Sequence, residues 1–473
     1  MGGKGEQEAE PVTPAGRFFL QPKGQNIIHC VVGLMHPIDI EATKREIKNT
    51  LLKHPRFCSL LIRDKHGREL WKRTQVEIDN HVIFPDLSGL EEAEPAELGS
   101  EEELINRYLA DLAVSSPLDE TKPLWEIHIL QAQRCCVLRI HHALGDGISL
   151  MSLFLASCRR AGQPDRPPSF PLPKPSPVRS VKEKLRRMVM VVWLTILYSL
   201  EFVLYSLWVK DPETAISGGA GVELWPRKVA TARFSLEDMK LVKKAVGGTV
   251  NDVLFGVVTS GLARYLEMRT PRKSSKASPI SGLALVNTRL RPGLQDLSLM
   301  LKQGSKTRWG NQMGYVVLPI DVQQKDPTDP LEYLRKAKAM LDRKKLSLEA
   351  RFSYKMGSLV MSLFGPKIAT WINYRIISRT TFTISNVAGP QEETMFAGNP
   401  IRFLRATSTS IPHALTMHMV SYMGSAEMQI LVAKDIIPDP GFLAKCFQDA
   451  LLEMKDASSA ALQTPQHLGI AQS

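Results

Sequence analysis

Cysteine is scarce in this sequence, and the spacing of the few cysteines argues against a cysteine-bound metal. The chain has 473 residues and six cysteines, and none of the spacings matches a metal-binding motif. Cys135 and Cys136 lie in an apolar run with strand propensity. We therefore expect buried thiols in a protein of a reducing compartment. The six positions are 30, 58, 135, 136, 158 and 446.

Targeting and nucleic-acid-binding signals are also missing. Residues 1–10 lack the apolar core of a signal peptide, and Glu6 stands where a myristoylation motif needs serine or threonine, so we expect a short disordered tail there. No zinc-finger, helix-turn-helix or RNA-binding aromatic signature accompanies the formal net charge of +12. The charge predicts an anionic partner other than nucleic acid, such as a phosphorylated ligand or an acidic membrane surface. A merely basic, solvated surface is the alternative.

The strongest signal that the sequence does contain is the motif His-His-Ala-Leu-Gly-Asp-Gly at residues 141–147. It has the pattern HHxxxDG and directly follows the β-prone run 135–140. Side chains alternate between the two faces of a strand, so His142 shares a face with the more uniformly apolar even-numbered residues and should face inward. An imidazole held there can be neutral near pH 7 and accept a proton from a hydroxyl group, which typically accelerates a reaction by about 10²- to 10⁴-fold.

The second half of the motif predicts a tight loop. Gly145 and Gly147 would let the chain turn sharply after the strand, with Asp146 held between them. Asp146 could pair with an arginine and hold the loop, or it could orient a histidine. We favour loop support, because a gap of four residues through two glycines folds away more easily than it reaches back.

Two plainer interpretations of the histidine pair stay open. Both side chains could be structural, one buried and one solvated. They could also bind a metal, since histidine is a common metal ligand. Adjacent strand residues point to opposite faces, however, and no second cluster of His, Cys or Asp completes a ligand set. We therefore expect no metal.

Helical periodicity and β-prone runs alternate along the chain, which is typical of an α/β protein. In the first half we expect a hairpin of strands at 125–130 and 135–140 and a helix at 148–159, so that the motif lies in the loop between strand and helix. A proline-rich stretch at 163–180 predicts an extended linker. The expected organisation is a tail at 1–10, one α/β domain at 11–162, the linker and an apolar helix at 163–225, a second α/β domain at 226–460 and a tail at 461–473.

The apolar run 188–209 is preceded by basic residues and has about the ~20 residues that a membrane-spanning helix needs. Glu201 lies well inside it, at a cost of about 2.5 to 3.5 kcal/mol for a charge near the bilayer centre. A single span would also leave the two halves of the chain on opposite sides of the membrane. We expect the helix to lie in the membrane interface, with a buried core helix as the alternative. Its polar residues share one helical arc: Thr195, Tyr198, Ser199, Tyr205 and Ser206.

Further segments accompany HHxxxDG in a fixed order. They are Thr13-Pro14-Ala15-Gly16-Arg17-Phe18, His54-Pro55-Arg56-Phe57, Pro117-Leu118-Asp119 with Pro123-Leu124-Trp125-Glu126, Asn251-Asp252-Val253-Leu254, and Ser385-Asn386-Val387-Ala388-Gly389-Pro390. HHxxxDG alone is shared by chloramphenicol acetyltransferase, the plant alcohol acyltransferases and peptide-synthetase condensation domains. The whole set resembles the plant-type bifunctional wax ester synthase/diacylglycerol acyltransferase family, and the likeness spans residues 11–458. The Asp-Phe-Gly-Trp-Gly element of the plant alcohol acyltransferases is absent.

The resemblance implies two chloramphenicol-acetyltransferase-like domains with mixed sheets and an active-site tunnel between them. It implies transfer of a long-chain acyl group from acyl-CoA to a fatty alcohol, to diacylglycerol or to both, with His142 as general base and no acyl-enzyme. No Gly-x-Ser-x-Gly elbow or recognised cysteine nucleophile favours a covalent route. His141 would support His142, while Asp146 and Gly147 would shape the loop.

The roles of the accompanying residues are less sharply defined. Asn251, Asp252, Asn386 and Trp125 are expected to bind or support substrate, and the two asparagines are candidate donors to an oxyanion. Local pattern offers another role for Asn251 and Asp252, because both fall in a first helical turn, where they would cap the helix. Arg289 is a possible partner for Asp146.

The expected partners are acyl-CoA, the lipid acceptor and a membrane surface, with no bound cofactor. The expected location is the endoplasmic reticulum membrane, with the plasma membrane as a second site and the catalytic domains in the cytosol. Two other functions stay open. One is a soluble acyltransferase that acts on a small polar alcohol or amine, and the other is a non-catalytic lipid-binding protein.

Overall fold

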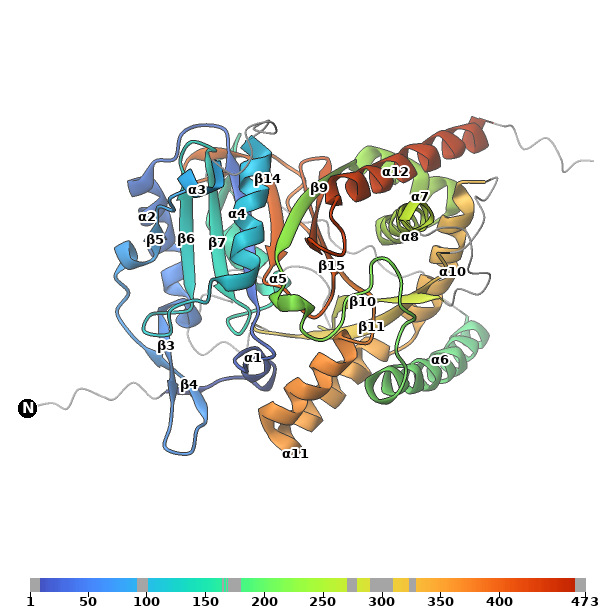
Figure 1. The fold of residues 1–473 in the computed structure, drawn as a ribbon, viewed down its shortest axis with the longest axis horizontal. Coiled ribbons are helices and arrows are strands. Elements are labelled where there is room, and N and C mark those ends of the chain that lie inside the picture. The colour runs from blue at the N-terminus through green and yellow to red at the C-terminus, as the bar shows by residue number, and fades with distance from the viewer. Residues whose placement is uncertain are drawn as a thin grey trace, which may run out of the picture.

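The computed structural model places two mixed sheets side by side, each covered by helices (Figure 1). It describes residues 9–91, 101–163, 166, 168, 180–269, 279–289, 309–322 and 329–463. Most of the proline-rich linker and of both expected tails therefore lies outside the described residues. The described parts of the tails are ordered elements, because Glu10 belongs to a short strand and residues 461–463 end the last helix.

The first sheet has the strand order β5-β6-β7-β2-β14-β13-β8. Its strands are β5 (Val82–Ile83), β6 (Trp125–Leu130), β7 (Cys135–His141), β2 (Ile27–Leu34), β14 (Asn399–Ser408), β13 (Thr394–Phe396) and β8 (Cys158–Arg160). A small sheet of β1 (Glu10–Pro11), β4 (Glu69–Arg73) and β3 (Ser59–Arg63) lies beside it. The helices of this half are α1 (Pro14–Phe19), α2 (Ile40–Asn49), α3 (Ser88–Glu91), α4 (Glu101–Ser115) and α5 (Gly147–Ala156).

The second sheet has the order β11-β10-β12-β15-β16-β9. Its strands are β11 (Met313–Ile320), β10 (Ile280–Asn287), β12 (Phe382–Ala388), β15 (Leu415–Tyr422), β16 (Ser425–Ala433) and β9 (Arg227–Ser235). The pairs β10–β12 and β12–β15 are parallel and the others antiparallel, so the sheet is mixed as expected. One face forms a large apolar core with α7 (Leu236–Val246), α8 (Val250–Arg269) and α12 (Pro440–Gln463).

Two strands from the expected second domain belong to the first sheet. β14 pairs with β2 in antiparallel fashion, and β13 pairs with β14 and with β8. The range 226–460 therefore does not fold as a separate layer, since residues 394–408 complete the sheet that carries the HHxxxDG loop. Strand pairing between residues hundreds apart leaves no local pattern, and this crossover was not expected from the sequence.

The strand before the motif is buried on both faces. Its even-numbered residues Cys136, Leu138 and Ile140 lie in the core of the first sheet. Its odd-numbered residues Cys135 and Val137 pack under α4. The alternation of side chains had suggested that one face of β7 points inward and the other outward. Both faces are buried, because α4 covers the second face.

The apolar run belongs to α6 (Val181–Leu207), which begins earlier than the run itself. Ser180 and Glu183 form a capping box, which satisfies free backbone N–H groups and starts the helix in its basic segment. Only 11% of its most apolar 18-residue window is buried, so α6 is not a core helix. Among the described helices it alone, as a single helix, has the length and hydropathy to cross a membrane. Beside it lie α10 (Leu331–Leu346) and α11 (Glu349–Ile377).

Candidate active site

His142 lies just beyond the end of β7, where Asn311 contacts the Nδ1 edge of its ring and Phe19 contacts a ring face. Its Nδ1 is 2.9 Å from Oδ1 of Asn311, and Nδ2 of Asn311 donates to the backbone oxygen of His142 at 2.8 Å. An amide oxygen can only accept, so Nδ1 carries the proton and Nε2 keeps its lone pair. The Phe19 ring stacks on the imidazole with 4.1 Å between ring centroids. Asn311 and Phe19 therefore set both the tautomer and the plane of the ring.

Burial lowers the pKa of His142, and the nearby Asp146 carboxylate opposes part of that effect. The imidazole is consequently neutral near pH 7, as a general base must be. Burial also lowers the pKa of His141, to about 3. The Nδ1 of His141 accepts a hydrogen bond from Ala143 N at 3.2 Å, which helps to hold the turn after the strand.

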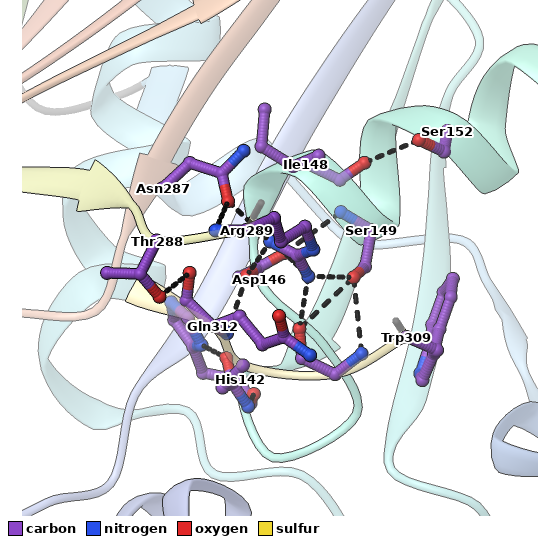
Figure 2. Close-up of polar contacts among 12 residues, drawn as sticks. His142, Asp146, Ile148, Ser149, Ser152, Asn287, Thr288, Arg289, Trp309 and Gln312 are labelled. Carbon is purple, nitrogen blue, oxygen red and sulfur yellow. Dashed lines mark hydrogen bonds and ion pairs between the residues drawn. The ribbon is translucent and has the colours of Figure 1, made fainter. Parts of the chain in front are cut away.

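Asp146 joins the HHxxxDG loop to the second sheet (Figure 2). It is the N-cap of α5, where its Oδ1 accepts from Ser149 N at 2.9 Å. Arg289 donates to both carboxylate oxygens, at 2.7 and 3.0 Å, across 143 residues of sequence. Gln312 N donates to Oδ2 at 2.9 Å. The suggested contact between Asp146 and Arg289 is thus present, and it is a buried, bidentate ion pair.

The two glycines of the motif provide space rather than unusual backbone angles. Neither Gly145 nor Gly147 has a positive φ, so the expected need for glycine conformational freedom is wrong. A Cβ on Gly145 would lie 3.2 Å from the Trp309 ring, and one on Gly147 would lie 3.3 Å from Val387. Trp309 is also fixed by its Nε1, which donates to Leu144 O at 2.7 Å. The loop is therefore packed tightly against the second half of the chain.

A cavity of about 700 Å³ lies between the two sheets and includes His142 in its wall. That volume is within the ~300 to 1,000 Å³ of typical small-molecule sites. The first half contributes mainly apolar residues, among them Phe19, Ile27 and Leu124. The second sheet contributes the polar residues Thr383, Ser385, Thr416 and His418. Polar residues of the first half and apolar residues of the second sheet also line the wall, among them Asn26 and Leu285, so the two kinds of residue are mixed.

His418 is a second imidazole in the cavity wall that the sequence did not single out. Its Nδ1 is 2.7 Å from Ser385 Oγ and its Nε2 is 3.4 Å from Ser408 Oγ. Burial, with a smaller contribution from His142, lowers the pKa of His418 to about 4. Among the described residues no group of three His, Cys, Asp or Glu side chains is arranged to hold a metal ion.

The other expected site residues are distributed unevenly. Asn386 lines the cavity and donates through Nδ2 to Asn251 Oδ1 at 2.7 Å, but Asn251 itself is outside the lining. Asp252 is buried, forms a capping box with Thr249 and makes an ion pair with Lys345 at 2.5 Å. The capping interaction of Asp252 that the local pattern suggested is therefore present.

Trp125 is also outside the cavity lining. It is a core residue of β6, where its Nε1 donates to Phe57 O at 2.9 Å and its ring stacks on His81.

Three residues of the second half that contact the HHxxxDG loop had no signal in the sequence. Asn311, Gln312 and Trp309 belong to no motif that we recognised, and 169 residues separate Asn311 from His142. Their role follows only from the approach of the segment before β11 to the HHxxxDG loop.

Solved structures from two groups of enzymes share this two-domain fold. The wax ester synthase/diacylglycerol acyltransferase from Marinobacter aquaeolei VT8 superposes with a TM-score of 0.57 at 17% identity, covering 95% of this chain and 100% of that one. The first condensation domain of the CDA synthetase gives a TM-score of 0.54 at 14% identity, covering 99% and 100%. The expected fold class, α/β with two domains and mixed sheets, is confirmed. The fold is that of these acyltransferase and condensation-domain structures.

Sequence comparison narrows the class to one family. Residues 33–254 match the family model of the wax ester synthase/diacylglycerol acyltransferase catalytic domain, and residues 309–455 match that of the WS/DGAT C-terminal domain. Wax ester synthase/diacylglycerol acyltransferase 5 of Arabidopsis thaliana is 37% identical, with 95% of this chain and 94% of the relative covered. Number 4 of the same plant is 36% identical, with 97% and 92% covered. The chain belongs to the wax ester synthase/diacylglycerol acyltransferase family and is an acyltransferase.

Proposed function

We propose that this enzyme transfers a long-chain acyl group from acyl-CoA to a fatty alcohol, to diacylglycerol or to both, with His142 as the general base. The acceptor hydroxyl gives its proton to Nε2 as its oxygen attacks the thioester carbonyl. The imidazolium then protonates the departing CoA sulfur, so the proton is conserved and no acyl-enzyme forms. The observation that carries this proposal is the buried His142, whose Nδ1 proton is held by Asn311 and which lines the cavity between the sheets.

Other residues of the motif support His142 in this scheme. His141 holds the turn, and Asp146 with Gly147 holds the loop against the second sheet. Asn386 is our candidate donor to the substrate, because its Nδ2 has a second hydrogen beyond the one given to Asn251. Asn251 would support the substrate site by orienting Asn386. For Asp252 we retain the capping role, and for Trp125 a role in the core.

We further propose that the enzyme works on the surface of the endoplasmic reticulum membrane, with the plasma membrane as a second site, through the outer face of α6. The polar arc of α6 faces the protein: Thr195 Oγ1 accepts from Leu348 N, and Glu201 pairs with Lys344 at 2.6 Å. Tyr205 OH is 2.7 Å from Ser281 Oγ. These contacts are spread along the helix, which favours a helix lying flat rather than spanning. All six cysteines are free, which supports a cytosolic position of the catalytic domains.

The polar residues in the cavity wall favour a second candidate acceptor. Thr383, Ser385, Thr416 and His418 place polar groups in the wall that a plain alkyl chain cannot use. A small polar alcohol or amine could use them, and the enzyme would then act away from membranes.

Acyl transfer by the purified full chain tests these proposals. Labelled acyl-CoA is supplied with a fatty alcohol, with diacylglycerol or with a small polar alcohol, and the labelled ester is measured. His142→Ala should lower the rate by at least about 10²-fold. His66→Ala, an exposed histidine in the β3–β4 turn, should leave it unchanged and is the matched control. Unchanged transfer by His142→Ala would show that the motif is not catalytic, and a wild-type chain that binds lipid but transfers nothing would favour a lipid-binding protein.

A further inference from the structure

α11 exposes large apolar side chains around a sharp bend. Gly365, with φ 78° and ψ 176°, interrupts the helix, and it restarts at Pro366. Proline suits a first helical turn, because it has no N–H that needs an acceptor. Leu363 and Phe364 lie at the bend with 65% and 60% of their surfaces exposed, and Trp371 lies beyond it with 51% exposed. Leu359 and Ile368 are also exposed.

α11 packs beside α6, and both helices expose large apolar side chains. The two helices pack together through Phe202 and Phe352, and Arg375 Nη2 donates to Leu207 O at 3.0 Å. Figure 1 shows both helices along the lower side of the molecule. We define the α6–α11 surface as their exposed apolar residues: Val181, Leu185, Met188, Val189, Met190, Val192, Trp193, Ile196, Leu197, Leu200, Leu204 and Leu207 of α6 with Leu359, Leu363, Phe364, Ile368 and Trp371 of α11. Exposed apolar residues gathered on two neighbouring helices mark an interaction site.

The charges around the α6–α11 surface favour an anionic bilayer as its partner. The exposed basic residues on these two helices are Lys182, Lys184, Arg186, Arg187, Arg351, Lys355 and Lys367. Glu183 is the acidic residue in the first turn of α6, and its carboxylate accepts from Ser180 N in the capping box. An apolar face bordered by lysine and arginine is the pattern of a helix that enters the headgroup region of an anionic membrane.

The part of α11 beyond the bend connects this surface to the cavity. Asn373, Tyr374 and Ile377 line the cavity, and Tyr374 follows Trp371 by three residues, a rise of about 4.5 Å along the helix. Tyr374 OH donates to Glu223 Oε1 at 2.7 Å, and Lys23 Nζ lies 5.0 Å from the centre of the Tyr374 ring.

The residues around Tyr374 form a mouth of the cavity. Lys23 and Glu223 are themselves part of the lining, and so is Leu224, which is 73% exposed. The exposed Leu224 indicates that the cavity opens here, at Tyr374, three residues along α11 from the exposed Trp371.

We propose that α11 docks on the bilayer together with α6 and brings the mouth formed by Lys23, Glu223 and Tyr374 against the lipid, so that the lipid acceptor passes from the bilayer into the cavity. This rests on the proposed acyl transfer to a water-insoluble acceptor. Passage through water would expose every methylene of the acceptor, which the hydrophobic effect opposes. Acyl-CoA, whose headgroup is water-soluble, needs no such contact.

The test compares an acceptor dissolved in a bilayer with an acceptor dissolved in water. The double variant Leu363→Ser with Phe364→Ser alters exposed side chains outside the cavity lining. Its matched control is Met268→Ser with Leu452→Ser, two exposed apolar residues of α8 and α12. Each full-length protein is assayed with acyl-CoA and either diolein in phosphatidylcholine/phosphatidylserine vesicles or hexanol in vesicle-free buffer. Flotation with the same vesicles measures docking, and a thermal unfolding curve checks the fold.

For the α11 variant we expect at least about a tenfold loss of kcat/KM on vesicle diolein, weaker flotation and an unchanged rate with hexanol. The control variant should match the wild type in all three. Equal losses on diolein and hexanol, or no loss on diolein, would overturn the proposal. The proposal would also be overturned if the wild type sedimented as a dimer and added vesicles did not dissociate that dimer. A second copy of the chain would then cover the α6–α11 surface. A wild type inactive on both acceptors would contradict the proposed function alone, and flotation would still decide the docking.

Discussion

Asn311 offers the sharpest test of how this site works, because its side chain holds the Nδ1 proton of His142. We compare Asn311→Ala, which removes the acceptor, with Asn311→Asp, which replaces it by a carboxylate of similar shape. Leaving the buried Nδ1–H without an acceptor costs about 1 to 3 kcal/mol. If the ring must be held in this tautomer to react, that cost appears in the barrier and lowers kcat by about 5- to 150-fold.

The two variants should move the pH profile in opposite directions. The hydrogen bond that His142 Nδ1 donates to Asn311 raises the pKa of His142 against the effect of burial, so Asn311→Ala should lower that pKa further. Asn311→Asp places a negative charge 2.9 Å from the imidazole, judged by the wild-type distance, and should raise the pKa by about 1 to 3 pH units. The base must be neutral to act. The acid limb of the profile should therefore move to lower pH in Asn311→Ala and to higher pH in Asn311→Asp.

The assay is kcat/KM for acyl transfer between pH 5 and 9, with the substrate that the wild type uses. Asn311→Asp should be most impaired at neutral pH and recover as the pH rises. Gln21→Ala, a half-buried amide near α1 that is outside the cavity lining, is a control for general loss of an amide side chain. An acid limb that stays in place in both Asn311 variants would refute the reasoning, because the group that titrates could not then be His142.

Three further predictions concern stability, measured by urea unfolding. Arg289→Leu should lower the free energy of unfolding by about 3 to 5 kcal/mol, because it leaves the Asp146 carboxylate buried and unpaired. The double variant Asp146→Leu with Arg289→Leu should lose less than the sum of the two single variants, and a loss equal to that sum would argue against their coupling. Gly145→Val should cost about 1 to 3 kcal/mol because the new side chain meets Trp309. Gly162→Val, where an added Cβ meets nothing within 4 Å, is the control, and an unaffected Gly145→Val would contradict the packing. Burial raises the pKa of Glu349 from 4.5 to about 7, so between these pH values the carboxyl is ionised in the unfolded chain and protonated in the folded one. The free energy of unfolding should therefore fall as the pH rises from 4.5 to about 7. Glu349→Gln should flatten this slope, and an unchanged slope would mean that other groups cause it.

Much of the site could be predicted from short stretches of sequence because the interactions concerned are local. The strand 135–141, the turn after it and the cap of α5 by Asp146 all arise within one segment. The capping box at Thr249 is local in the same way. The amphipathic arc of α6 was also visible, since a helix repeats every 3.6 residues. In the structure that polar arc faces the protein.

The tertiary structure decided what these local elements meet. It brought Asn311 to His142 across 169 residues and Arg289 to Asp146 across 143, and it inserted β14 into the first sheet. It also left Trp125 and Asp252 outside the cavity lining and added His418 to the cavity wall. A sequence pattern reports which face of an element is apolar, but the partner of that face depends on chain crossings that no local pattern encodes. The sequence by itself therefore determined the motif, the histidine expected to act as base, and the family. The contacts that set the tautomer and the pKa of this histidine exist only in the folded chain.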